Sequence, residues 1–231
     1  MCGRFNLTVS GEELAEAFEL DDPPEMAARY NIAPTQPVAV VRLDPASHGR
    51  RLSTPRWGLV PKGAPEGDRG HINARGETAW QKPSFREAFA ERRCLVPATG
   101  FYEWQALSLK PKRRQAWAFG LTSGRAFAFA GLWEPPAREG APETCTILTT
   151  QPNDVTRPVH DRMPVILAPD SYARWLTPEP GGALALRPLL RPFPAETMTA
   201  WPVSSAVNSP RCDEPVCLKR VDQEPPPPRL F

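Results

Sequence analysis

The sequence predicts a single α+β domain built on a curled, mostly antiparallel, barrel-like β-sheet with short flanking helices. Thirty of the 231 residues are proline, against an ordinary share of about 5 %. Because proline lacks an amide proton and interrupts helix interiors, this content excludes long helices. Runs of β-branched and aromatic residues dominate the middle of the chain. Neither an internal repeat nor a linker-like change of composition divides the chain before residue 222, so one domain is the economical prediction.

Two short helices and two strands are predicted within the first 93 residues. Ser10-Gly11-Glu12-Glu13 forms a capping box, and the apolar residues that follow it share one helical face. Residues 37–43 and 51–59 are predicted strands separated by a turn-prone stretch. Ser84-Phe85-Arg86-Glu87 is a second capping box, which predicts a helix that ends near Arg93.

Residues 94–149 are predicted to supply most of the sheet. Strands are expected at 94–104, 115–121, 126–133 and 144–149, with turns rich in proline, glycine and basic residues between them. A helical turn at 152–156, a strand at 163–167, a helix at 170–176 and a last strand at 197–204 follow. We therefore place the domain at residues 1–221. Residues 222–231 contain four consecutive prolines and predict an extended or disordered tail.

The charge balance alone does not decide whether the protein binds nucleic acid. The formal net charge is +2, which is mild for a nucleic-acid-binding protein. Of the 28 cationic residues, however, 23 are arginine, whose planar guanidinium suits phosphate recognition. A GC-rich genome would give the same bias, so both interpretations stay open.

Cysteine usage and the absence of long apolar runs predict a protein of the cytoplasm. Five cysteines are scattered through the chain, and an odd, unpatterned number favours a reducing compartment. No apolar stretch has the length or flanks of a signal peptide or a membrane helix. We expect no contact with a membrane.

Cys2 carries distinctive chemistry if Met1 is removed. The residue then has a free α-amine beside its thiol, with reference pKa values of about 7.7–8.0 and about 8.5, so both groups are partly nucleophilic near neutral pH. An aldehyde can condense with such an amine to an imine, and the thiol can close a five-membered thiazolidine ring. The alternative is that a cysteine follows the initiator methionine by chance and has no chemical role.

Six ordered motifs surround this chemistry. They are Met1-Cys2-Gly3-Arg4-Phe5, Tyr30-Asn31-Ile32-Ala33-Pro34-Thr35, Trp57-Gly58-Leu59-Val60-Pro61, Asn73-Ala74-Arg75-Gly76-Glu77-Thr78, Pro97-Ala98-Thr99-Gly100-Phe101-Tyr102-Glu103-Trp104 and His160-Asp161-Arg162-Met163-Pro164. In this order they resemble the SOS response-associated peptidase (SRAP) family, also called abasic-site processing proteins. The resemblance runs from residue 1 to about Asn208.

The resemblance implies a DNA-damage response protein that binds single-stranded DNA and traps abasic sites covalently. A ring-opened abasic deoxyribose is an aldehyde, so it supplies the electrophile for the thiazolidine on Cys2. The family also suggests AP-lyase and crosslink-reversal activities, autoproteolytic removal of Met1, and a formal class of peptidase, that is, hydrolase. By the same resemblance we expect a monomer that is cytoplasmic and associates with the bacterial nucleoid when bound to damaged DNA.

The resemblance places three further catalytic residues beside Cys2. The Asn73 amide would orient the sugar or the amine by hydrogen bonding. Glu103, flanked by aromatic residues, would have a raised pKa and shuttle protons during imine formation, ring opening and reversal. His160 would exchange a proton near the sugar oxygen. The alternatives are structural: Asn73 would be a turn residue, Glu103 an exposed strand residue, and His160 a histidine without a catalytic role.

Four residues are candidates for the DNA-binding surface. By the resemblance Arg75 would hold a phosphate, unless it pairs with Glu77. Arg4 and Arg162 are second candidates for phosphate contacts. Trp57 would stack on an unpaired base or belong to the core. The basic stretch 110–114 is interpreted as a solvated hairpin tip rather than a distant backbone contact.

The sequence predicts neither a metal nor a cofactor. Cys212 and Cys217 lack a second cysteine pair or a histidine that would complete four ligands, and no phosphate-binding glycine loop is present. Two other functions stay open: a thiol peptidase or N-terminal-nucleophile amidase that uses Cys2, and a single-strand binder without catalysis.

Overall fold

The computed structural model describes residues 2–44, 47, 49–65, 67–109, 112–177 and 182–222. One of its two sheets has five strands in the order β14-β9-β8-β1-β2. All neighbours in this sheet are antiparallel. The strands are β1 (Phe5–Leu7), β2 (Arg29–Ile32), β8 (Gly100–Leu109), β9 (Lys112–Leu121) and β14 (Met198–Pro202).

The second sheet has nine strands, with a main path in the order β12-β11-β10-β7-β3-β4. Strand β13 pairs with β10, whereas β5 and β6 run parallel to β11. The strands are β3 (Val40–Leu43), β4 (Arg50–Ser53), β5 (Arg56–Trp57), β6 (Asn73–Arg75), β7 (Arg93–Ala98), β10 (Phe127–Glu134), β11 (Thr144–Thr150), β12 (Met163–Pro164) and β13 (Ile166–Leu167). The predicted α+β class with a curled, mostly antiparallel sheet is confirmed, but the strands form two open sheets rather than one closed barrel.

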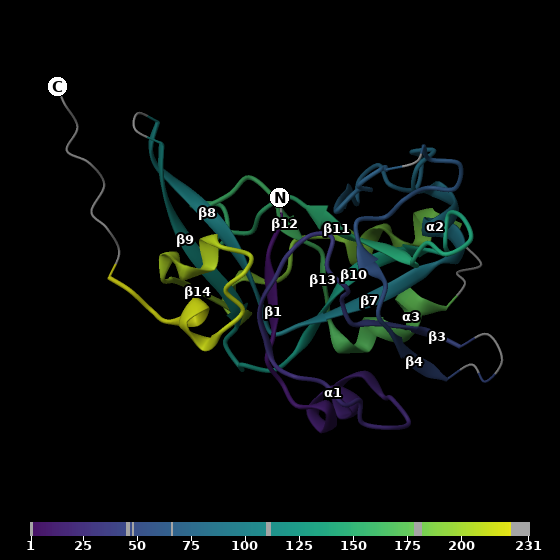
Figure 1. Ribbon diagram of the computed structural model, residues 1–231, viewed down its shortest axis with the longest axis horizontal. Helices are drawn as coiled ribbons and strands as arrows, with labels where there is room; N and C mark the ends of the chain where they lie inside the picture. The colour runs from purple at the N-terminus through teal and green to yellow at the C-terminus, as the bar shows by residue number, and fades with distance from the viewer. Residues whose placement is uncertain are drawn as a thin grey trace.

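Thr99 marks the point where the chain passes from one sheet to the other. The sequence predicted one strand over 94–104, but β7 ends at Ala98 and β8 starts at Gly100. The amide of Thr99 donates to the Asn6 carbonyl at 2.8 Å, and its hydroxyl accepts from the Thr8 amide at 3.0 Å. Strand β1 is thereby held at the junction of the two sheets (Figure 1).

The helices are short, as the proline content predicted. Helix α1 (Gly11–Phe18) begins at the predicted capping box, with Ser10 and Glu13 bonded reciprocally. Helix α2 (Arg86–Glu91) is present, but its N-cap is Phe85 and makes no side-chain hydrogen bond, so the second capping box was wrong. Helices α3 (Tyr172–Leu176) and α4 (Gly182–Leu186) complete the set, with 3-10 turns at Pro169–Ser171, Arg187–Leu190, Ala195–Thr197, Ser205–Asn208 and Pro215–Leu218.

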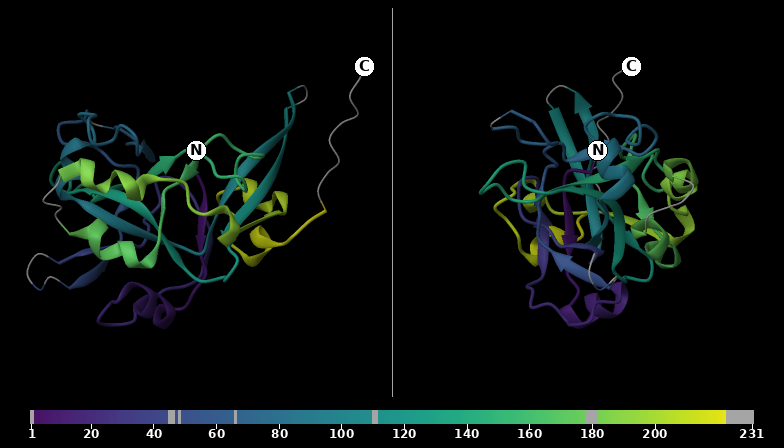
Figure 2. Two further views of the ribbon diagram at one scale, coloured as in Figure 1. Left: turned by 180° about the vertical axis from the view of Figure 1, so that it is seen from behind. Right: turned by 90° about the vertical axis from the view of Figure 1, so that its right-hand side faces the viewer.

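Residues 203–221, which we call the C-terminal strap, cross the five-stranded sheet. The two ends of the strap meet, since Val203 bridges Arg220 and the Ser204 amide donates to the Lys219 carbonyl at 3.0 Å. Val207 and Cys217 pack with Tyr102 in a small apolar cluster that is separate from the main core. Figure 2 shows the strap beside the β8–β9 hairpin.

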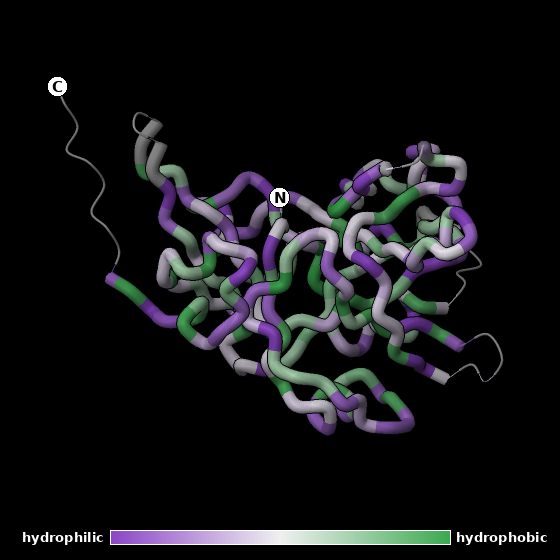
Figure 3. Tube along the Cα trace, in the orientation of Figure 1, coloured by the Kyte–Doolittle hydropathy of each residue, from purple (hydrophilic) through white to green (hydrophobic). Residues whose placement is uncertain are grey.

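Apolar segments are most frequent in the strands at the centre of the molecule, and hydrophilic segments are most frequent in the outer turns (Figure 3). The largest fully buried side chains of the core are aromatic, among them Trp57, Trp175 and Phe101. Burial of aromatic rings is a main source of stabilisation in a chain with little helix. Within the described residues, no helix is long and apolar enough to cross a membrane. Residues 110 and 111 of the basic stretch and residues 223–231 of the tail lie outside those residues.

Candidate functional site

Cys2 lies just before β1 and is fully buried. Its carbonyl oxygen accepts a hydrogen bond from Asn73 Nδ2 at 2.8 Å. Asn73 begins β6, where it pairs with Ile147 of β11. The hydrogen bond therefore joins the N-terminal segment, which leads into the five-stranded sheet, to an edge of the nine-stranded sheet.

Glu103 reaches the same place from β8. Phe5 pairs with Phe101, and the Tyr102 amide donates to the Arg4 carbonyl at 3.0 Å. Continuing this antiparallel register brings Gly3 opposite Glu103. The carboxyl is only 4 % exposed, and burial raises the pKa of Glu103 to about 7, with a smaller contribution from the Asp161 carboxylate.

The same burial governs the thiol of Cys2. Removal from water, together with the neighbouring Glu103 carboxylate, raises the pKa of the Cys2 thiol well above its ordinary value. The thiol is therefore protonated at neutral pH. A sulfur in this state needs a proton acceptor before it can attack, unlike the ionised cysteine of a typical thiol hydrolase.

His160 lies in the turn between β11 and β12, with its Nε2 atom 3.8 Å from Glu103 Oε2. Burial lowers the pKa of His160, so the ring is neutral near pH 7. Its Nδ1 atom accepts from the Arg162 amide at 3.0 Å, which puts the single ring proton on Nε2, facing the carboxyl. Asp161 Oδ1, 2.9 Å from Nδ1, becomes the partner when the ring is protonated.

The amide oxygen of Asn73 has no hydrogen-bond partner in the described part of the chain. Asn73 Oδ1 is buried and accepts no hydrogen bond, while Nδ2 of the same amide is occupied by Cys2. An unsatisfied buried acceptor costs about 1–3 kcal/mol. Such an atom is suited to accept a hydrogen bond from a substrate hydroxyl or an amine.

Arg162 and Glu77 form a pair that the sequence did not predict. Both terminal nitrogens of Arg162 donate to the Glu77 carboxylate, at 2.6 and 2.8 Å, and one also donates to the Thr149 carbonyl at 2.7 Å. Burial opposes ionisation of Glu77, but the Arg162 hydrogen bonds outweigh it, so the pKa of Glu77 is lowered. The guanidinium fork that we expected to face DNA is thus occupied within the protein.

Arg75 is placed differently from Arg162. Its side chain is exposed and makes no hydrogen bond or ion pair with any described residue. The Glu77 carboxylate is bound by Arg162 and forms no hydrogen bond or ion pair with Arg75, although the charge of Arg75 contributes to the lowered pKa of Glu77. Arg75 is one residue from Ala74 and two from Asn73 along β6, so it lies at the rim of the site.

Trp57 and Arg4 are more embedded than a DNA-contacting role requires. Trp57 is fully buried, packs edge-on against Phe5 with 5.2 Å between ring centroids, and donates to the Ile72 carbonyl at 2.8 Å. Because its ring offers no face to a base, this burial favours the interpretation of Trp57 as a core residue. One nitrogen of Arg4 donates to Asn31 Oδ1 at 2.8 Å and to the Val207 carbonyl at 2.7 Å, contacts that sequence reasoning missed.

The family is settled by a match over most of the chain. The model of the family described as SOS response associated peptidase (SRAP) matches residues 1–210. The chain belongs to the SRAP family. It is 42 % identical over 228 residues to "Abasic site processing protein YoqW" of Bacillus subtilis, covering 95 % of this chain and 99 % of that protein. Against "Abasic site processing protein HMCES" of Pongo abelii the identity is 29 % over 273 residues, covering 96 % and 77 %.

Solved structures give the same fold for this SRAP chain. A protein from Bacteroides thetaiotaomicron superposes with a TM-score of 0.79 at 24 % identity and covers 95 % of this chain and 100 % of that chain. A protein from Bordetella bronchiseptica superposes with a TM-score of 0.74 at 28 % identity, covering 88 % and 100 %. Both neighbours agree with the curled, mostly antiparallel architecture.

The four predicted catalytic residues are brought together from four separate segments. Cys2, Asn73, Glu103 and His160 meet at the junction of the two sheets, through the contacts described above. A carboxyl with a pKa of about 7 beside a neutral imidazole can give and accept protons at neutral pH. In the described residues, no group of three or more histidine, cysteine or acidic side chains is arranged to hold a metal ion.

The raised pKa of Glu103 predicts a pH-dependent cost to stability. Between its ordinary pKa of 4.5 and its native pKa of about 7, the folded protein binds the proton more tightly than the unfolded chain, so this residue's contribution to stability is lost as the pH rises through that window. We compare the unfolding free energy of Glu103→Gln with that of the wild type by urea unfolding. The difference, variant minus wild type, should become more positive by about 2 kcal/mol when the pH is raised from 5 to 8.

A matched control uses a carboxyl outside the site. Glu16 lies on the exposed face of α1, so Glu16→Gln should change the unfolding free energy by the same small amount at both pH values. Equal behaviour of the two variants would show that Glu103 does not titrate near neutrality.

Proposed function

We propose that the protein processes abasic sites in single-stranded DNA by forming a covalent thiazolidine between Cys2 and the ring-opened sugar. The observation that carries the proposal is the clustering of Cys2 with Asn73 and with a carboxyl whose pKa is about 7. Membership of the SRAP family and the names of the relatives from Bacillus subtilis and Pongo abelii support the substrate. A cellular role in the response to DNA damage follows.

The reaction starts at the α-amine that Cys2 acquires once Met1 is removed. The amine adds to the aldehyde carbon, and the carbinolamine loses water to give an imine. The sulfur then bonds to the imine carbon, the thiol proton passes to the imine nitrogen, and the ring closes. The buried thiol is protonated in the resting site, which favours attack by the amine first and by the sulfur second.

Glu103 supplies and removes the protons of these steps. In its protonated form it gives a proton to the departing hydroxyl of the carbinolamine, and as a carboxylate it accepts the thiol proton during ring closure. With a pKa of about 7, both forms are populated at neutral pH. The reverse sequence releases the crosslink, and elimination from the imine before ring closure would give the lyase reaction.

His160 and Asn73 have supporting roles. The Nε2 proton of His160 faces the Glu103 carboxyl at 3.8 Å, close enough to join a proton relay through a sugar oxygen or a water molecule. The free Oδ1 atom of Asn73 accepts from the amine or a sugar hydroxyl. These contacts hold the aldehyde carbon at the N-terminal residue.

Single-stranded DNA is the proposed partner because an unpaired abasic nucleotide needs no extraction from a base stack. Arg75 is the phosphate contact that the geometry favours, since its guanidinium is exposed at the rim of the site. Arg162 acts indirectly, by fixing Glu77 and the loop of His160. We propose that one protein molecule acts on one abasic site.

Met1 must leave before this chemistry begins. We propose that the site itself assists the hydrolysis of the Met1–Cys2 bond, with Glu103 activating water. A peptidase or amidase that acts on other molecules is less consistent with the geometry, because burial raises the pKa of Cys2 and the ring proton of His160 faces Glu103 rather than the sulfur. Trans-acting peptide or glutamine hydrolysis is therefore an outcome to be tested.

Replacement of Cys2 should abolish the covalent adduct. Wild-type protein whose mass confirms loss of Met1 should form a heat-stable adduct with an oligonucleotide that carries one abasic site, with the mass of protein plus DNA minus one water. Cys2→Ala should form no such adduct, whereas Cys212→Ser, which removes a half-exposed thiol elsewhere, should form it normally.

Two results would contradict the proposed function. One is the same thiazolidine mass with Cys2→Ala. The other is turnover of peptides or release of ammonia from glutamine by protein that forms no adduct with abasic DNA. Mass spectrometry and an ammonia assay on the same preparation separate these cases.

Glu103→Gln should slow the adduct without weakening DNA binding. Loss of a positioned acid-base group typically costs 10²–10⁴-fold in rate, and we expect at least a hundredfold slower formation or reversal, measured by single-turnover quench. The rate for wild type should change near the native pKa of about 7, and this pH dependence should be absent from the variant. Unchanged rates in both directions would remove Glu103 from the mechanism.

Arg75→Ala should weaken binding through the loss of one phosphate contact. The slope of log affinity against log salt should fall in magnitude by about 1, with equal effects on different base sequences. Arg125, an exposed arginine that lines a pocket together with residues of α1, provides the control. Arg125→Ala should leave the slope unchanged, and equal slopes for both variants would show that Arg75 contacts no phosphate.

A further inference from the structure

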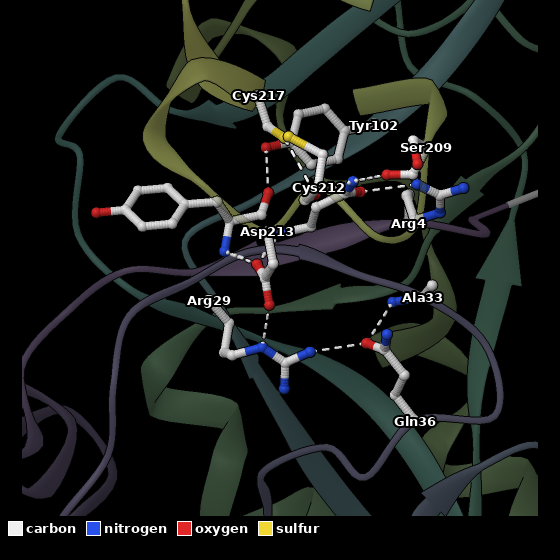
Figure 4. Close-up of polar contacts among 11 residues, drawn as sticks. Arg4, Arg29, Ala33, Gln36, Tyr102, Ser209, Cys212, Asp213 and Cys217 are labelled. Carbon is white, nitrogen blue, oxygen red and sulfur yellow. Dashed lines mark hydrogen bonds and ion pairs between the residues drawn. The ribbon is translucent and has the colours of Figure 1, made fainter. Parts of the chain in front are cut away.

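Cys212 and Cys217 of the C-terminal strap bring two free thiols together. Their sulfur atoms lie 3.5 Å apart, and the Cys217 thiol also contacts the Cys212 carbonyl at 3.3 Å. Figure 4 shows both side chains pointing toward each other. A disulfide needs about 2.05 Å between sulfurs, which side-chain rotation and a small shift of the strap can supply.

The two thiols differ in their access to solvent. Cys212 is partly exposed, whereas Cys217 is fully buried among Tyr102, Val203 and Val207. Burial raises the pKa of the Cys217 thiol to about 11. This is the arrangement of a dithiol in which an accessible sulfur reacts first and a covered neighbour resolves the product.

The same strap carries acceptors for the segment that precedes β1 and for β2. Asn31 donates to the carbonyl oxygens of Ser209 at 2.9 Å and Cys212 at 2.6 Å. Its Oδ1 atom accepts from Arg4, which also donates to the Val207 carbonyl. The main chain of Cys212 is thus two hydrogen bonds away from Arg4, a residue close to Cys2 in the sequence.

Asp213 strengthens this attachment. Its carboxylate accepts from the amides of Tyr30 at 2.5 Å and Asn31 at 2.7 Å, and it pairs with Arg29. Hydrogen bonds from these groups lower the pKa of Asp213 although burial opposes its ionisation. The residue next to Cys212 is therefore already anchored before any disulfide forms.

We propose that Cys212 and Cys217 form a redox modification site that reacts with a low-molecular-weight disulfide and closes to an intramolecular disulfide, which fixes the part of the C-terminal strap whose main chain bonds to Asn31. The observations that carry it are the distance between the sulfurs, their unequal exposure and the anchoring of the strap to Arg4 and Asn31. The inference is independent of the proposed DNA chemistry, because neither thiol belongs to that site.

The exchange balances in two steps. The Cys212 thiolate attacks one sulfur of the small disulfide, forms a mixed disulfide and releases one small thiolate. The Cys217 thiol then gives up its proton and attacks Cys212 Sγ, breaking the mixed disulfide and releasing the second small thiolate. In sum two protein thiols and one small disulfide give one protein disulfide and two small thiols.

The test uses the full chain and glutathione disulfide as the probe. Reduced protein is incubated with the probe under native conditions, free thiols are blocked with N-ethylmaleimide, and intact mass and peptide mapping follow. Wild type should lose two hydrogens, carry no glutathione and show a single link between Cys212 and Cys217. Dithiothreitol should reverse the change.

Single serine variants reveal the order of the steps. Cys217→Ser should accumulate glutathione on Cys212, since the resolving thiol is missing. Cys212→Ser should gain at least tenfold less glutathione on Cys217, because that sulfur is buried. The oxidised wild type should also unfold a few degrees higher than the reduced protein, and the two serine variants should lack this shift.

The proposal is overturned if wild-type protein keeps a stable mixed disulfide on Cys212, if the mapped link involves another cysteine, or if both thiols stay reduced at potentials that oxidise an unfolded peptide spanning residues 209–220. The mapping on wild type decides the question even if a serine variant fails to fold. An unchanged abasic adduct in oxidised protein would leave this proposal intact, and a missing adduct in reduced protein would concern only the proposed function.

Discussion

The hydrogen bond from Asn73 to the carbonyl oxygen of Cys2 is the constraint on which the site depends. Chain termini are usually mobile unless something holds them. Here the N-terminal segment leads into β1, a strand with partners on both sides, and Asn73 ties residue 2 to the other sheet as well. A chemistry that uses the first residues of a chain needs this rigidity, because the reacting atoms must stay aligned with fixed acid-base groups.

The site also contains groups that the fold would be more stable without. Glu103 is a carboxyl in an almost dry environment, and Asn73 carries a buried oxygen that has no partner in the described structure. By contrast, the two terminal nitrogens of Arg162 and the Glu77 carboxylate bond to each other and hold the surrounding loops. The costs of the buried Glu103 carboxyl and of the Asn73 oxygen thus fall at the place where a substrate would bind.

Local patterns predicted much of the fold, and contacts distant in sequence explain where they failed. The Ser10 capping box and the positions of most strands depend on neighbouring residues, so they were predictable. The break at Thr99 depends on hydrogen bonds to Asn6 and Thr8, which no local pattern reveals. Helix α2 begins after Phe85 without the capping box that was predicted at Ser84. The burial of Ala88 and Phe89 outweighed this local capping pattern.

The candidate site shows the same division. The chemistry of Cys2 and the aromatic setting of Glu103 pointed to both residues, and the family resemblance supplied Asn73 and His160. The pairing of Arg162 with Glu77 and the burial of Trp57 were out of reach, since they arise from strands that meet only in the folded sheet. The contacts of the strap with Arg4 and Asn31 span more than 170 residues of sequence, and an ordinary loop composition gave no sign of them.

Those long-range contacts have a consequence for the order of events in the cell. The segment around Cys2 needs β8, and Arg4 needs the Val207 carbonyl, so Cys2 cannot reach its buried position until synthesis has passed Val207. Ribosomes add about 5–20 residues per second, which leaves on the order of ten to forty seconds in which residues 1 and 2 are exposed on the nascent chain. An external aminopeptidase can reach residues 1 and 2 only in that interval, and after folding only the hydrolysis that we propose for the site itself remains.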